Sequence, residues 1–168
     1  MQIRRFTDTD WPAVWDLLQA TFASGDTYAF APDSSEAEIH RAWIEAPQST
    51  WVACSDDEAD DGTLLGTYLL KPNQPGLGGH VCNCGYVVAP AARGRGVATA
   101  LCEHSQQEAM ARGYRAMQFN LVVSTNTGAV RLWQSLGFGI VGTLPGAFRH
   151  RELGFVDAHV MFKTLVSP

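Results

Sequence analysis

The stretch YVVAPAARGRGVATAL, residues 86–101, joins an apolar strand to a helix through a turn of small residues. A helix that begins directly after such a turn leaves its first backbone N–H groups unpaired, and the positive end of its dipole lies there. Glycines let a ligand approach the backbone, and Arg93 and Arg95 add charged donors. The stretch predicts a pyrophosphate cradle, and an ordinary strand-turn-helix with incidental arginines is the alternative.

Two other phosphate-binding loops do not fit this stretch. A Walker loop ends in Gly-Lys-Ser/Thr, which is absent here. The dinucleotide fingerprint needs a third glycine where Thr99 stands, and an acidic residue after the next strand, which ends instead in Val-Val-Ser. The cradle therefore indicates a different class of phosphate-containing ligand.

A second segment, NTGAVRLWQSLGF (residues 126–138), follows the next apolar strand. Asn126 is a suitable helix cap, and Gly137 ends the helix before another strand begins. In this order and at this separation, the two segments resemble the GNAT (Gcn5-related) acetyltransferases. The acetyl-CoA loop of that family, Gln/Arg-x-x-Gly-x-Gly/Ala, and its next segment, Asn-x-x-Ala-x-x-x-Tyr-x-x-x-Gly-Phe, are matched at Arg93, Gly96, Ala98, Asn126, Ala129, Gly137 and Phe138.

The resemblance implies an α/β (α+β mixed) fold built on a single central sheet, mixed but mostly antiparallel and flanked by helices. The strands at about residues 81–89 and 115–123 are expected to splay apart, with the pantetheine arm of acetyl-CoA in the gap. Acetyl-CoA is the expected co-substrate. Its expected contacts are Val87, Val88, Arg93, Gly94, Arg95, Gly96, Val97, Ala98, Thr99, Asn126 and Trp133.

The resemblance also implies how catalysis proceeds. A backbone N–H near Val88 is expected to stabilise the oxyanion. The family often has a tyrosine, the usual proton donor to the departing thiolate, where this chain has Trp133. An indole is no practical proton donor, so another group protonates the thiolate or it leaves as the anion. Trp133 is alternatively a core residue.

A narrower resemblance involves GHVCNCGYVVAPAARGRG (residues 79–96) and YRAMQFNLVVSTN (residues 114–126). These stretches are similar to the yeast acetyltransferases that detoxify the proline analogue azetidine-2-carboxylate. By that resemblance, Asn83 donates to a substrate carboxylate, and Asn120 lies beside the amine or thioester as a catalytic residue. Both occupy apolar strands that we expect to be central, where a buried amide needs partners. Backbone groups at a bulge near Gly85 are the alternative partners.

Other residues are candidates for the acceptor site. Tyr28, Phe30 and Phe148 are expected as pocket walls or, alternatively, as core residues. Arg149 either pairs with a substrate carboxylate or lies in solvent. The general base is open between an ordered water, Asp157 and His150. No metal is expected, because His80, Cys82 and Cys84 lack an evident fourth ligand, and no base is fixed beside Cys84 to make it a nucleophile.

The composition fits one globular domain over residues 1–168, with 46% apolar and 17% charged residues. A net charge of -5 argues against nucleic-acid binding. No apolar run is long enough to span a membrane, and no apolar region follows the first arginines as in a signal peptide. Four sparse cysteines favour reduced thiols and a cytoplasmic location.

Apolar periodicity and breakers predict the remaining elements. One helix is expected from a cap at residues 8–10 to residue 24, and another from Ser34 or Ser35 to residue 45, with an acidic turn at 56–62. A loop containing Pro145 and Gly146 is expected to join the last two strands. The other expected strands are 3–6, 50–54, 63–71, 138–143 and 154–165.

We therefore expect an N-acetyltransferase that moves an acetyl group from acetyl-CoA to the amine of a small molecule, by direct transfer in a ternary complex. An amino acid or an amino-acid analogue is the expected acceptor. The alternatives are acetylation of a protein or peptide, and a CoA-binding sensor without turnover. A homodimer is possible, because dimers are common in the family.

Overall fold

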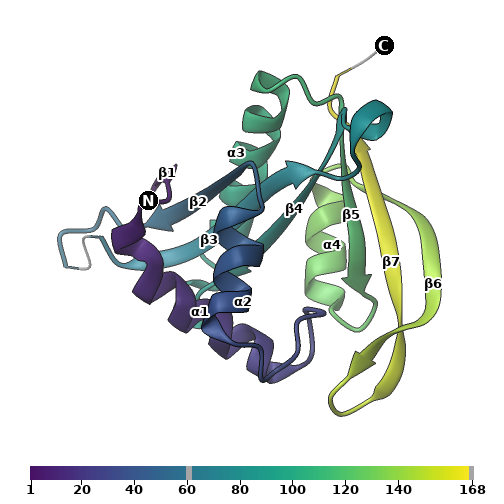
Figure 1. Cartoon of the computed structure of the whole chain (residues 1–168), viewed down its shortest axis with the longest axis horizontal. Helices are drawn as coiled ribbons and strands as arrows, with labels where there is room; N and C mark the ends of the chain where they lie inside the picture. Colours follow the sequence, from purple (N-terminus) through teal and green to yellow (C-terminus); the bar gives the residue numbers. More distant parts are fainter. Residues whose placement is uncertain (60–61, 167–168) are drawn as a thin grey trace.

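A seven-stranded sheet in the order β1-β2-β3-β4-β5-β7-β6 forms the centre of the molecule (Figure 1). The computed structural model describes residues 1–59 and 62–166, so residues 60–61 of the expected acidic turn lie outside the described part. All neighbouring strands are antiparallel except β4 and β5, which confirms the mixed, mostly antiparallel sheet. The strands are β1 (Gln2–Arg5), β2 (Ser49–Cys54), β3 (Leu64–Pro72), β4 (Val81–Val88), β5 (Ala116–Val123), β6 (Gly139–His150) and β7 (Gly154–Thr164).

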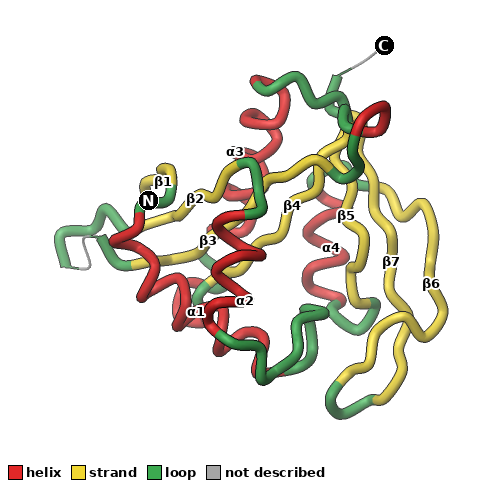
Figure 2. The backbone as a smooth tube through the Cα atoms, in the orientation of Figure 1, coloured by secondary structure: helices red, strands yellow, loops and turns green. Residues whose placement is uncertain are grey.

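Helices cover both faces of this sheet (Figure 2). On one face, α1 (Trp11–Ser24) and α2 (Glu36–His40) share a hydrophobic cluster with Leu69 and Val87. On the other face, α3 (Val97–Ala111) and α4 (Thr127–Ser135) share a second cluster with Tyr68 and Met117. The sheet therefore separates two cores.

The first helix shows how local sequence sets these boundaries. Pro12 lies in the first turn of α1, where its missing N–H costs nothing. Gly25 ends the helix in the left-handed conformation, with φ 66°. The residues that α1 buries against the sheet recur at helical spacing and are Val14, Leu17, Leu18 and Phe22.

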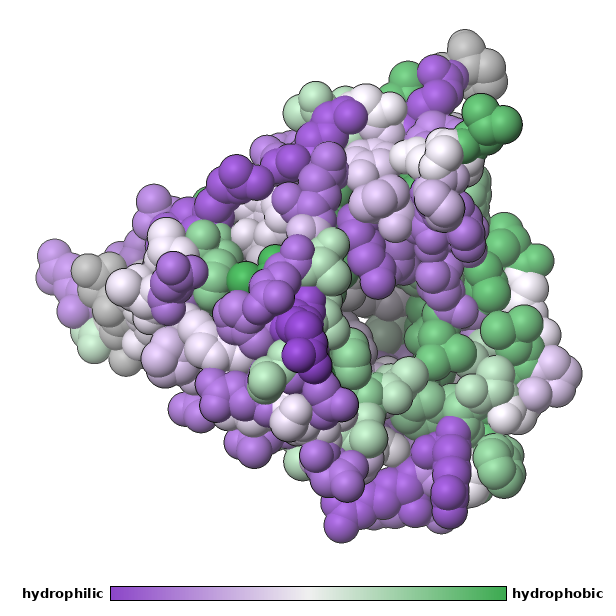
Figure 3. Space-filling view, viewed as in Figure 1, coloured by the Kyte–Doolittle hydropathy of each residue, from purple (hydrophilic) through white to green (hydrophobic). Residues whose placement is uncertain are grey.

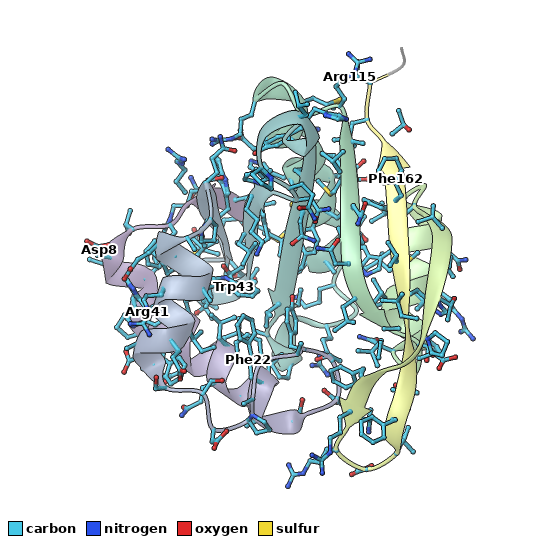
Figure 4. The ribbon with its side chains drawn as sticks, turned by 45° about the vertical axis from the view of Figure 1, so that its right-hand side comes forward. Asp8, Phe22, Arg41, Trp43, Arg115 and Phe162 are labelled. Carbon is cyan, nitrogen blue, oxygen red and sulfur yellow. The ribbon has the colours of Figure 1, made fainter. Side chains whose placement is uncertain are left out.

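The second helix is divided, although a single helix to residue 45 was predicted. After α2, the chain widens into a five-residue π-helical segment, η2 (Arg41–Glu45), in which the Ala46 N–H donates to the Arg41 carbonyl at 2.8 Å. This segment directs Trp43 onto the sheet, where its ring centroid lies 6.1 Å from that of Phe22 (Figure 4). The two aromatic rings pack against the aromatic residues of the α1–α2 loop.

Strands β4 and β5 pair only at one end. The pairs Val81–Ala116 and Cys82–Met117 are in parallel register, and beyond them the strands separate. The Asn83 side chain bridges the start of the gap by donating from Nδ2 to the Gln118 carbonyl at 2.8 Å. The predicted splay is therefore present.

The end of the sheet differs from the prediction. Pro145 and Gly146 do not form a loop between two strands, because β6 runs from Gly139 to His150 through a bulge between Leu144 and Phe148. β6 is an edge strand, and a bulge there tolerates both a proline and a glycine. The Asp157 carboxylate fixes the bulge by accepting from the Gly146 N–H at 2.9 Å.

Candidate functional site

The register of β3 against β4 determines which backbone groups face the gap. The Ala89 N–H donates to the Leu65 carbonyl and the Asn73 N–H to the Val81 carbonyl, both at 2.8 Å. Because bonded and non-bonded positions alternate in an antiparallel pair, the N–H groups of Tyr86 and Val88 point away from β3. They therefore face the opening toward β5, whereas the Val87 N–H faces β3.

The turn after β4 presents a second set of donors. Gly94 and Gly96 have φ values of 73° and 78°, and a Cβ atom at either position would meet no atom within 4 Å. Within the described chain, Ala100 is the first residue of α3 to donate to a helical carbonyl, that of Gly96 at 3.0 Å. The N–H groups before it are available to an anion at the positive end of the helix.

A cavity of about 800 Å³ runs from this turn along the gap. It combines a charged, glycine-rich end with an open strand edge, and this combination fits a ligand that carries a pyrophosphate and an extended amide-containing arm. Exposed Arg95 is not among its lining residues. Ten of the residues expected to contact acetyl-CoA line it: Val87, Val88, Arg93, Gly94, Gly96, Val97, Ala98, Thr99, Asn126 and Trp133.

A second cavity, of about 570 Å³, lies on the other side of the gap and reaches the face covered by α1 and α2. Figure 3 shows a hollow between the α2 side of the molecule and the strands to its right. Six aromatic residues contribute to the walls of this cavity, and they are Tyr28, Phe30, Trp43, Tyr86, Phe119 and Trp133. Its polar residues include Lys71, Asn83 and Asn120. The cavity therefore suits a small, partly apolar molecule with one polar end.

The two cavities meet, because Tyr28, Tyr86, Asn126 and Trp133 line both of them. The Tyr28 hydroxyl donates to the Tyr86 carbonyl at 2.8 Å. Burial raises the pKa of Tyr28, so the phenol stays neutral and keeps its proton for this bond. A group held in the first cavity can thus be reached from the second at this junction.

Trp133 is both a core residue and a cavity wall. It is 9% exposed, and its ring centroid lies 5.1 Å from those of Tyr86 and Phe119. Both interpretations of Trp133, as a core residue and as a contact of acetyl-CoA, are therefore compatible with its position.

The Asn126 side chain also has a structural function. Its Oδ1 accepts from the Ala129 N–H at 3.2 Å and caps α4.

The two asparagines differ in their surroundings. Asn83 is half-buried, whereas Asn120 is exposed at a bulge in β5, so the expectation of a buried amide was wrong for Asn120. Its Nδ2 donates to Asn73 Oδ1 at 2.7 Å, and its Oδ1 accepts from Gln118 at 2.9 Å. Both side chains nevertheless line the second cavity.

Four residues of the β6–β7 hairpin that the sequence singled out line neither cavity. Phe148 is buried opposite Val156, and Arg149 is exposed. The Asp157 carboxylate is bonded to the β6 bulge. His150 Nδ1 accepts from two backbone N–H groups of the following turn, at 3.1 and 3.2 Å. The structure therefore does not bring these four residues to the junction.

The cysteines of β4 face the core that α3 covers. Cys82 and Cys84 are buried together with Cys102, and burial raises the pKa of the Cys84 thiol well above its usual value. Cys84 is therefore a neutral thiol at physiological pH. Within the described residues, no group of three or more His, Cys, Asp or Glu side chains is arranged to hold a metal ion.

Several cavity residues were not predicted from the sequence, and Trp43, Phe119 and Lys71 are three of them. Trp43 and Phe119 fit the apolar patterns of a helix and a strand, and these patterns do not distinguish a core residue from a pocket wall. Lys71 ends an apolar strand, LLGTYLLK, and a charge at a strand end usually lies in solvent. The cross-strand pairing of Lys71 with Asn83 becomes visible only in the folded sheet.

Comparison with known proteins agrees with this architecture. The acetyltransferase (GNAT) family matches residues 11–138. A GCN5-related N-acetyltransferase from Kribbella flavida is 44% identical, with a TM-score of 0.90 over 97% of this chain and 96% of that one. The structure of yncA from Salmonella typhimurium with its cofactor acetyl-CoA, 21% identical, has a TM-score of 0.84 over 100% of this chain and 95% of that one.

A curated relative is matched over a shorter region. The N-acetyltransferase aca1 of Schizosaccharomyces pombe is 37% identical over 99 residues. This region is 58% of the present chain and 47% of aca1, so the match spans about half of that relative's length.

Proposed function

Because the chain belongs to the GNAT family of acetyltransferases, we propose that it transfers the acetyl group of acetyl-CoA to the amine of a small, carboxylate-bearing molecule. The observation that carries this proposal is the junction of the two cavities at Tyr28, Tyr86 and Trp133. Two substrates bound on either side of the splayed strands would meet there. Transfer is therefore direct, in a ternary complex.

The cavity along α3 is the proposed site of acetyl-CoA. The N–H groups at the start of α3 and the Arg93 side chain bind the pyrophosphate, and the open edge of β4 binds the pantetheine arm. Asn126 contacts this arm near the thioester. The co-substrate supplies an activated acetyl group, and the chain's contribution is to hold and orient it.

The backbone of Val88 is the proposed oxyanion donor. Its N–H points into the gap and is held in position by the sheet, so it needs no reorganisation as charge develops on the carbonyl oxygen. The amine nitrogen adds to the thioester carbonyl; when the carbonyl re-forms, the C–S bond breaks, the thiolate of CoA leaves, and the nitrogen gives up its remaining extra proton to water. A thiol with a pKa near 8.5 can leave as the thiolate, so no tyrosine is required at position 133.

The amine must lose a proton before it attacks. Within the described part of the chain, the lining of the second cavity contains no carboxylate and no histidine. Of the bases open from the sequence, an ordered water is therefore the one that the cavity accommodates. The pH dependence of the reaction then reflects the acceptor amine.

The proposed acceptor is an amino acid or an analogue of one, such as a proline analogue. Support comes from the local resemblance to the azetidine-2-carboxylate acetyltransferases and from the aromatic walls of the second cavity. Such an enzyme would detoxify its substrate in the cytoplasm, where the four free cysteines would stay reduced. Among the described residues, no helix is both long and apolar enough to cross a membrane.

Release of the CoA thiol tests the proposal across amino acids, proline analogues, polyamines and peptides. We expect turnover on small carboxylated amines. In both Asn83→Ala and Asn120→Ala, kcat/KM for such an amine should fall at least tenfold, about 1.4 kcal/mol of transition-state stabilisation. Turnover on peptides alone would keep the enzyme class and overturn the acceptor. CoA binding with no turnover on any amine would support a sensor instead.

A further inference from the structure

Among the described residues that line the second cavity, here called the acceptor cavity because it is the proposed acceptor site, Lys71 is the one with a charged side chain. It lies at the exposed end of β3, directly opposite Asn83 in the β3–β4 register. Within residues 1–59 and 62–166, it takes part in no ion pair and no side-chain hydrogen bond. Its charge is therefore uncompensated at the cavity.

The alternation of the strand directs Lys71 toward this cavity. Side chains at alternate positions of a strand share one face, and Leu69 packs in the core beneath α1 and α2. The opposite strand places Asn83 and Gly85 on that face. A Cβ atom on Gly85 would lie 3.2 Å from the Tyr28 hydroxyl, which connects this face to the junction.

One N–H of each nearby amide is already engaged. Asn83 Nδ2 donates to the Gln118 carbonyl, and Asn120 Nδ2 donates to Asn73 Oδ1. These bonds connect β4 to β5, and β5 to Asn73 directly after β3. Both asparagines therefore hold the separated strands in position. A carboxylate in the cavity would find its strongest available partner in the free ammonium group.

We propose that Lys71 binds the carboxylate of the acceptor and thereby restricts the enzyme to amines that carry an acidic group. This inference rests on the proposed function. The carboxylate lies toward Lys71, and the amine, which an amino acid carries on the adjacent carbon, lies toward the Tyr86–Val88 edge. The aromatic walls beside these two groups contact the rest of the carbon skeleton. Lys71 is therefore a specificity determinant that does not touch the acetyl group.

The test compares an amino-acid acceptor with its own carboxamide. The carboxamide keeps the skeleton and the amine but lacks the negative charge. The quantity measured is the ratio of kcat/KM for the acid to kcat/KM for the amide, in the full chain with saturating acetyl-CoA. Because both acceptors are assayed on the same sample, partial loss of folded protein cancels in this ratio.

In Lys71→Met, we expect the acid-to-amide ratio to fall about tenfold, which is typical of one charge-assisted contact at a partly exposed site. Lys71→Arg should keep most of the wild-type ratio, and Lys71→Glu should favour the amide over the acid. Arg5→Met, on the edge strand β1 and outside both cavities, removes one positive charge and should leave the ratio unchanged.

The outcomes separate this inference from the function on which it rests. Turnover of both acceptors, with an equal ratio in wild type and Lys71→Met, would overturn the role of Lys71 and keep the acetyltransferase. A fall of the same size in Arg5→Met would show a general charge effect and also overturn it. Absence of turnover on either small acceptor in the wild type would overturn the proposed function itself.

Discussion

At the scale of single residues, Tyr28 links the two proposed substrate sites. Removal of its hydroxyl in Tyr28→Phe leaves the Tyr86 carbonyl unpaired. We expect the free energy of unfolding to fall by about 1 kcal/mol and KM to rise several-fold for both substrates. Urea unfolding and steady-state kinetics measure the two effects.

Tyr114→Phe is the matched control for this variant. Tyr114 is also buried and donates to Gln48 Oε1 at 2.8 Å, but it lines neither cavity. It should lose similar stability and keep wild-type kinetics. Equal kinetic changes in the two variants would show that Tyr28 acts only through general stability.

Asp10 provides a pH-dependent test of the first helix. Hydrogen bonds from Arg4 and from the Thr7 backbone lower the pKa of its carboxyl from 3.8 to about 2. Since the folded pKa is the lower one, its contribution is complete above about pH 4 and is lost as pH falls through about 2. Asp10→Asn should cost about 1 kcal/mol at pH 7, because Arg4 is partly exposed.

Urea unfolding at several pH values checks this prediction. The stability difference between wild type and Asp10→Asn should shrink as pH falls from 4 toward 2. A difference that persists unchanged at pH 2 would mean that the carboxylate charge is not its source.

At the scale of elements, the start of α3 is the proposed anion site. Gly96→Ala places a methyl group in open space at the helix end, where the pyrophosphate would lie. We expect CoA affinity to fall at least tenfold, about 1.4 kcal/mol, with a stability loss of about 1 kcal/mol from the positive φ. Calorimetric titration with CoA measures the affinity.

Gly113→Ala is the control at the other end of the same helix. Its φ is 84°, and a Cβ atom there also meets nothing within 4 Å. The backbone penalty should therefore be similar, while CoA binding stays unchanged. A matching loss of affinity in Gly113→Ala would contradict the assignment of the site to the N-terminus of α3.

The ends of helices and strands were predictable where a local signal in the sequence, such as a proline or a glycine, coincides with a boundary set by tertiary packing. Pro12 and Gly25 mark α1 in the sequence and bound it in the structure. Pro145 and Gly146 give an equally clear turn signal, yet they occupy a bulge, because pairing with β7 continues on both sides of them. Local chemistry does not reveal that partner strand.

The residues that line the two cavities were predictable to a similar extent and for the same reason. The residues of the α3 turn are contiguous in the sequence, and all but Arg95 of those expected there line the first cavity. The second cavity is assembled from the α1–α2 loop, the η2 segment, three strands and α4, so Lys71 and Phe119 carried no local sign of their place in it. Phe148 and His150 were proposed from a loop that turned out to be part of a strand.

At the scale of the whole molecule, two cavities share one junction across a splayed sheet, and the proposed acetyl transfer takes place there. The most direct measurement is the initial rate of acetylation of a small carboxylated amine, with the concentrations of both acetyl-CoA and the amine varied. We predict an acetylated amine as product and intersecting double-reciprocal lines, because both substrates must be bound together. Parallel lines would indicate an acetylated enzyme in place of direct transfer, and the absence of acetylated product would contradict the proposed function.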